Sequence, residues 1–146
     1  MLSPGHVVIV EDDEATREMV AALVAAHEFQ PIVAEDGLEA LHVLRAVRHR
    51  SPGVPCVVLL DLAMPRLSGH EFRRAQLADP IIAGVPVVVM SGTVDAGPRA
   101  AALGAVATLT KPLDVHALIS VVQRYCAVRD ESPAPLSPDV TDVPAV

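Results

Sequence analysis

The stretch CVVLLDLAMPRLSG, residues 56–69, ends an unbroken apolar run with a carboxylate. The apolar residues Cys56 to Leu60 lead directly into Asp61, and Pro65 and Gly69 follow as turn residues. A short run that is apolar at every position is typical of a strand buried on both faces. Open α/β sheets bind their ligands at the carboxyl ends of the strands. Asp61 is therefore the first candidate site residue.

The composition fits one domain with an aliphatic core. The chain has 146 residues, of which 51% are hydrophobic, but it has two Phe, one Tyr and no Trp. Its net charge is −7, from 18 acidic and 11 basic residues. Direct nucleic-acid binding is disfavoured, because phosphate contacts need Lys and Arg. An acidic chain is better suited to holding a cation or meeting a basic surface.

The two cysteines and the N-terminus favour a cytoplasmic location. Cys56 and Cys126 are far apart and lack metal-ligand spacing, so we expect two buried thiols in a reducing compartment rather than a disulfide. No apolar run reaches the roughly 18 residues of a membrane span, so we expect no membrane insertion. Residues 1–13, MLSPGHVVIVEDD, lack the basic region of a signal peptide.

Apolar runs alternate with helical stripes along the chain. Strands are predicted at residues 6–10, 31–34, 56–60, 85–90 and 106–109, and helices at 14–27, 38–48, 71–77, 99–103 and 115–128. This alternation predicts an α/β fold with a parallel sheet, helices on both faces and right-handed crossovers. The domain should span residues 1–128. Residues 129–146 are rich in Pro and aperiodic, which predicts a disordered C-terminal tail.

Four predicted strands end in polar residues that should meet at one edge of the sheet, namely Glu11 with Asp12, Asp61, Ser91 and Lys111. Neighbouring carboxylates repel, and Mg²⁺ resolves the repulsion because it prefers oxygen ligands. A carboxylate is also a nucleophile for phosphorus. An ammonium, a hydroxyl and a metal ion together neutralise a transferring phosphoryl group. The pattern therefore permits phosphoryl transfer to a carboxylate at this edge.

Five segments, in this order, resemble the receiver domain of two-component response regulators. They are VVIVEDDEATRE (7–18), AEDGLEAL (34–41), LLDLAMPRLSG (59–69), VVVMSGT (87–93) and LGAVATLTKPL (103–113). The resemblance covers about residues 5–128. It implies a flavodoxin-like (βα)5 doubly wound parallel sheet with the strand order 2-1-3-4-5.

The resemblance also implies roles for single residues. Asp61 falls on the phosphoacceptor, Ser91 on the switch hydroxyl and Lys111 on the lysine that pairs with the phosphate. The peptide bond before Pro112 is expected to be cis, which is uncommon even for proline.

The same resemblance implies a magnesium site. Arg17 sets the register of the acidic pair, which then falls on Glu11 and Asp12. Mg²⁺ would be held by Asp12, Asp61 and the backbone carbonyl of Ala63, with Glu11 acting through water.

Two features depart from the family pattern. Many receivers carry an aromatic residue at the position of Thr108, which takes part in passing the signal on, and Thr108 cannot do so in the same way. The segment 91–104 is shorter than usual, and Gly97-Pro98 interrupts it. We therefore expect a short or irregular fourth helix.

These observations favour a stand-alone response regulator. It would take its phosphoryl group from a sensor histidine kinase or a phosphotransfer protein, and signal by binding a downstream protein or by passing the group on. It would catalyse only its own phosphorylation and dephosphorylation. Two alternatives stay open. Thr108 suits a phosphate-independent docking receiver. A phosphatase of the haloacid dehalogenase type is less favoured, because that class needs an acid where this chain has Ala63.

Overall fold

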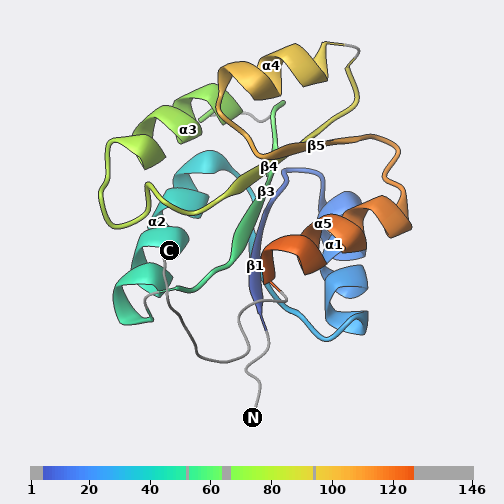
Figure 1. The fold of residues 1–146 in the computed structure, drawn as a ribbon, viewed down its shortest axis with the longest axis horizontal. Coiled ribbons are helices and arrows are strands. Elements are labelled where there is room, and N and C mark those ends of the chain that lie inside the picture. The colour runs from blue at the N-terminus through green and yellow to red at the C-terminus, as the bar shows by residue number, and fades with distance from the viewer. Residues whose placement is uncertain (1–4, 52, 64–66, 94, 127–146) are drawn as a thin grey trace, which may run out of the picture.

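The computed structural model describes residues 5–51, 53–63, 67–93 and 95–126 and shows a parallel sheet with helices on both faces (Figure 1). The strand order is β2-β1-β3-β4-β5, as predicted. The elements along the chain are β1 (His6–Val10), α1 (Glu14–Ala26), β2 (Gln30–Ala34), α2 (Gly37–Arg50), β3 (Val57–Asp61), α3 (Gly69–Leu77), β4 (Val87–Ser91), α4 (Ala96–Ala102), β5 (Ala107–Thr110) and α5 (Val115–Cys126).

The sheet separates two apolar layers. Successive side chains of a strand point to opposite faces, so alternate residues of β1 and β3 enter different layers. Val7, Ile9 and Leu59 pack with α1 and α5, whereas Val8 and Leu60 pack with α2 and α3. Figure 1 shows α1 and α5 on one side of the sheet and α2, α3 and α4 on the other. Both faces of the central strands are therefore buried, which explains their unbroken apolar runs.

The predicted elements are all present, with changes at their ends. Helix α2 continues to Arg50, two residues beyond its predicted end. Helix α4 is short, as predicted, with 7 residues, but it begins at Ala96 and contains Gly97 and Pro98. The prediction that this pair interrupts the helix was wrong, because a proline in the first helical turn removes no hydrogen bond. The turn at 64–66 and the predicted tail lie outside the described residues.

The cysteines form a disulfide, so the prediction of two thiols was wrong. Cys56 precedes β3 and Cys126 ends α5, and their Cα atoms lie 5.4 Å apart, within the usual range for a disulfide. The parallel topology explains the pairing, because strand starts and helix ends share the amino edge of the sheet. Gly5 leaves room there: a Cβ atom at Gly5 would lie 2.9 Å from Cys126 Cβ.

A buried glutamine, which the sequence pattern did not identify, ties α3 to the segment before β4. Gln76 is fully buried, and its Nε2 donates to the carbonyls of Ile82 and Val85, at 2.9 Å each. Its Oε1 accepts from Arg73 Nη1 at 2.8 Å. Buried carbonyls need such partners, because an unpaired one costs free energy.

We expect the substitution Gln76→Met to lower the free energy of unfolding by about 2 kcal/mol. Methionine has a similar shape but cannot donate to the two carbonyls. Val85 N–H still reaches the Ile82 carbonyl, so the penalty falls mainly on the Val85 carbonyl. Urea unfolding measures the change. Gln123→Met, at an exposed position of α5, is the control and should change stability by less than about 0.5 kcal/mol. Equal values for the two variants would contradict this role of Gln76.

None of the helices within the described residues combines the length and the apolar character that crossing a membrane requires.

Candidate functional site

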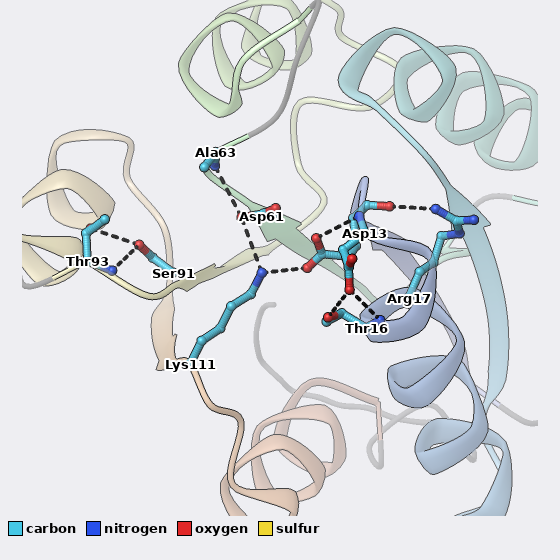
Figure 2. Close-up of polar contacts among 9 residues, drawn as sticks. Asp13, Thr16, Arg17, Asp61, Ala63, Ser91, Thr93 and Lys111 are labelled. Carbon is cyan, nitrogen blue, oxygen red and sulfur yellow. Dashed lines mark hydrogen bonds and ion pairs between the residues drawn. The ribbon is translucent and has the colours of Figure 1, made fainter.

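The carboxyl ends of four strands bring the predicted site residues together (Figure 2). Asp61, the last residue of β3, lies beside Met90 of β4 in the sheet. Ser91, the last residue of β4, pairs with Thr110 of β5. The backbone N–H of Lys111 then donates to the Ser91 carbonyl at 2.9 Å, which extends the strand pairing by one residue. Lys111 is thereby directed over the same edge as Asp61.

Three carboxylates form the centre of the site. Oxygen atoms of Glu11, Asp12 and Asp61 lie within 4.8 Å of one another. Glu11 and Asp61 are buried, at 1% and 4% exposure, whereas Asp12 is exposed. Burial, with smaller contributions from the hydrogen bond and the negative charge of Glu11, raises the pKa of Asp61 to about 7. Two buried carboxylates this close favour sharing a proton or binding a cation.

Lys111 supplies positive charge to the buried pair. Its Nζ lies 2.7 Å from Glu11 Oε1 and 3.7 Å from Asp61 Oδ1. Burial alone would lower the pKa of Lys111, but the hydrogen bond to Glu11 and the charge of Asp61 outweigh it and raise the pKa. Lys111 therefore stays charged. One ammonium group does not neutralise three carboxylates. The remaining negative charge of the cluster favours binding of a hard divalent cation.

The loop after β1 is held by Asp13 and Arg17. Asp13 begins α1 by accepting from the Thr16 N–H at 2.9 Å. Hydrogen bonds from Thr16 also hold the pKa of Asp13 below its usual value. Arg17 Nη1 donates to the backbone carbonyl of Glu11 at 3.1 Å, and the Asp13 N–H donates to Glu11 Oε2 at 3.2 Å. These contacts keep the Glu11 side chain in the cluster.

Ala63 and Pro112 flank the site. The Ala63 N–H donates to Asp61 Oδ1 at 3.2 Å and lowers the pKa of that carboxyl slightly against the larger raising effects. The role of the Ala63 carbonyl as a metal ligand stays a prediction. The Lys111–Pro112 peptide is cis, as predicted, and a second cis peptide precedes Pro55.

The buried Ser91 hydroxyl belongs to a hydrogen-bonded chain, only part of which the sequence indicated. Ser91 Oγ lies 3.0 Å from Thr93 Oγ1 and accepts the Thr93 N–H at 3.2 Å. Thr93 Oγ1 in turn donates to Asp95 Oδ1 at 2.7 Å. Figure 2 shows the Ser91 side chain directed to Thr93. Asp95 was missed as a partner, although the spacing Ser-x-Thr-x-Asp at the start of a helix could have identified it.

Thr108 lies outside this chain of contacts. It is half-buried on β5 and pairs with Val89 of β4. Its predicted effect on signal output stays a prediction.

The fold and the site define a class: a flavodoxin-like doubly wound α/β protein with three carboxylates and a lysine at the carboxyl edge of its sheet. Residues 7–123 match the model of the response regulator receiver domain. The chain belongs to this family, as the sequence predicted.

Relatives and solved structures agree with this assignment. The chain is 30% identical over 142 residues to protein Rrf1 of Nitratidesulfovibrio vulgaris. The aligned region covers 97% of this chain and 96% of Rrf1. It is 30% identical over 124 residues to the polar-differentiation response regulator DivK of Brucella anthropi, covering 84% of this chain and 96% of DivK. The receiver domain of the sensor histidine kinase PA1611 from Pseudomonas aeruginosa shares the fold, with a TM-score of 0.74, 21% identity and coverage of 84% and 98%.

Proposed function

We propose that Asp61 accepts a phosphoryl group from the phosphohistidine of a sensor histidine kinase or a phosphotransfer protein. The observation that carries this proposal is the position of Asp61. It ends the central strand β3, 3.7 Å from the Lys111 ammonium and in a cluster with Glu11 and Asp12. A buried carboxylate beside a fixed cation is suited to nucleophilic attack on phosphorus.

The reaction exchanges a phosphorus–nitrogen bond for a phosphorus–oxygen bond. A carboxylate oxygen of Asp61 bonds to phosphorus, the bond to the donor imidazole breaks, and the imidazole nitrogen keeps the electron pair and takes up a proton. Lys111 lies close enough to pair with an oxygen of the transferred group. Ser91 can donate its hydroxyl proton to another such oxygen. Fixed charges of this kind supply most of the catalysis that phosphoryl transfer needs.

The donor set of the cluster fits Mg²⁺. Asp12, Asp61 and the Ala63 carbonyl would hold the ion, and Glu11 would act through water. Bound there, Mg²⁺ would supply positive charge to the phosphoryl oxygens. The PA1611 receiver domain, which shares this fold, is described with a magnesium ion coordinated in its active site cleft. In this chain the cluster has more carboxylates than ammonium groups, and this excess of negative charge supports binding of Mg²⁺.

The output proposed for the domain is a change in affinity for a downstream protein, or transfer of the phosphoryl group onward. A coupling of about 1–3 kcal/mol between phosphorylation and partner binding would be typical. The net charge of −7 favours a protein partner over nucleic acid. We propose a cytoplasmic location because it suits a donor kinase whose phosphohistidine is on that side of the membrane. The cysteines no longer support this location, since they form a disulfide. The domain would act only on its own phosphoryl group and would not turn over free phosphoesters.

Incubation with acetyl phosphate and Mg²⁺, followed by intact mass measurement, tests the proposal. We expect the wild-type protein to gain the mass of one phosphoryl group, and Asp61→Asn to gain none. Asp114→Asn, at the exposed start of α5, is the matched control and should be labelled like the wild type. Chelation of Mg²⁺ should prevent labelling. Labelling that survives Asp61→Asn would refute the proposal, and turnover of a small phosphoester would favour a phosphatase.

A further inference from the structure

Asp95, which lies outside the site, determines which hydroxyl donates in the hydrogen bond between Ser91 and Thr93. Thr93 Oγ1 lies 2.7 Å from Asp95 Oδ1 and 3.0 Å from Ser91 Oγ. An ionised carboxylate can only accept, so Thr93 donates its single hydroxyl proton to Asp95. Thr93 has no second hydroxyl proton for Ser91. Ser91 must therefore be the donor in its bond to Thr93.

The ionised state of Asp95 is supported by its surroundings. The hydrogen bond from Thr93 holds the pKa of Asp95 below its usual value, and the charge of Arg99 adds to this effect. Arg99 Nη1 lies 3.8 Å from Asp95 Oδ1, one helical turn along α4. Asp95 stands at the start of α4 but makes no side-chain bond to the helix backbone, so its carboxylate is used by Thr93 and Arg99 instead.

A phosphoryl group on Asp61 would compete for the same proton. Its oxygens are also acceptors, so Ser91 can bond to them only by donating. That proton is already donated to Thr93, and Ser91 must give up this bond before it can reach the phosphoryl group. Thr93 then loses a partner, and the contact between Thr93 and Asp95 at the start of α4 is weakened.

We propose that Asp95 is a positioning residue that, through Thr93, holds the Ser91 hydroxyl away from Asp61 and couples phosphorylation of Asp61 to helix α4. The inference rests on the proposed function, because it needs a phosphoryl group at Asp61. It adds a path by which the signal leaves the site along β4 and α4, in the chain Ser91, Thr93, Asp95 and Arg99.

The first readout is the rate of labelling by acetyl phosphate with Mg²⁺. Thr93→Val and Asp95→Ala free the Ser91 proton, so we expect both variants to be labelled roughly twofold to tenfold faster, the factor that corresponds to one hydrogen bond. Asp95→Asn should also be faster, because an amide can donate to Thr93 and so reverse the chain. Thr93→Ser keeps the hydroxyl and should be labelled at the wild-type rate. The control Asp114→Ala, at the start of α5, should not change it.

The second readout is hydrogen exchange of the amides in α4, with and without phosphodonor. Phosphorylation should change the exchange of Ala96–Ala102 in the wild type and in Thr93→Ser. It should leave the exchange of this helix unchanged in Thr93→Val and Asp95→Ala, although both are labelled. Thermal unfolding of each variant shows that it is folded, and a variant that melts at room temperature is replaced by Asp95→Asn.

The outcomes separate the two proposals. If the wild type is labelled but the valine and alanine variants match it in rate and in the α4 response, the coupling through Asp95 is refuted and the phosphoacceptor role of Asp61 stands. If the wild type takes up no phosphoryl group, the proposed function fails, and the coupling fails with it.

Discussion

Reduction of the Cys56–Cys126 disulfide is expected to lower the free energy of unfolding by about 4 kcal/mol. The bond joins residues 70 positions apart, so it closes a long loop in the unfolded chain. Breaking it returns conformational entropy to the unfolded state, and the loss of stability grows with the length of the loop. Such a loss is a large part of the stability of a domain of this size.

Urea unfolding with and without dithiothreitol measures this effect, with the thiols counted in each sample. The double variant Cys56→Ser/Cys126→Ser is the control: it should be less stable than the oxidised wild type, and dithiothreitol should not change it. If the wild type has two reactive thiols after unfolding without reductant and its midpoint is unaffected by dithiothreitol, the cysteines are free thiols, as the sequence had suggested.

The disulfide lies at the edge of the sheet opposite the candidate site. Cys56 precedes β3, and Asp61 is the last residue of that strand. Reduction should therefore weaken the attachment of the end of α5 to the start of β3 and leave the carboxylate cluster in place. Labelling of Asp61 by acetyl phosphate should persist in the reduced protein under conditions in which it remains folded, which separates loss of stability from loss of the site.

The sequence predicted those features that depend on repeated patterns. The apolar runs of β1, β3 and β4 are unbroken because both faces of the strands are buried, and alternation with helices then requires a parallel sheet. Since parallel strands end at one edge, the same pattern predicted that Asp61, Ser91 and Lys111 would meet there. The register of Glu11 and Asp12 followed from Arg17, whose side chain contacts the backbone at Glu11.

The features that were missed depend on single contacts between distant segments. The pairing of Cys56 with Cys126 depends on where a helix ends relative to a strand start, and spacing along the chain carries no such information. Gln76 looks like an ordinary polar helix residue, yet it bonds to carbonyls that become buried only when α3 packs. The role of Asp95 depends on which atom donates to Thr93, and only the positions of the side chains decide that.

We expect the stability of the metal-free protein to fall as the pH rises from about 4 to about 7. The pKa of Asp61 is about 7 in the folded protein, against its ordinary value of 3.8. Between these values the folded state holds a proton that the unfolded state has lost. Stability therefore decreases with rising pH in this window and levels off above it. A shift of this size corresponds to roughly 4 kcal/mol, which partial screening by solvent reduces to on the order of 3 kcal/mol.

Urea unfolding between pH 5 and pH 8, in the presence of a chelator, measures this slope. Asp61→Asn is the informative variant: it removes the titrating group, so its stability should depend less on pH and should exceed that of the wild type at pH 8. The lowered pKa values of the exposed residues Asp13, Glu71 and Asp95 act in the opposite direction and below this window, since their stabilisation is lost as the pH falls. Equal slopes for the wild type and Asp61→Asn would contradict the assignment of the slope to Asp61.

Magnesium should oppose this loss of stability. The ion binds carboxylates in their ionised form, so its affinity should rise with pH until Asp61 has lost its proton near pH 7. A ligand that binds only the folded state stabilises it by an amount that grows with concentration over the dissociation constant. Added Mg²⁺ should therefore stabilise the wild type more at pH 8 than at pH 5, and stabilise Asp61→Asn much less at either pH. Equal stabilisation of both proteins at pH 8 would show that the ion binds away from Asp61. Mg²⁺ would then not neutralise the negative charge of the carboxylate cluster.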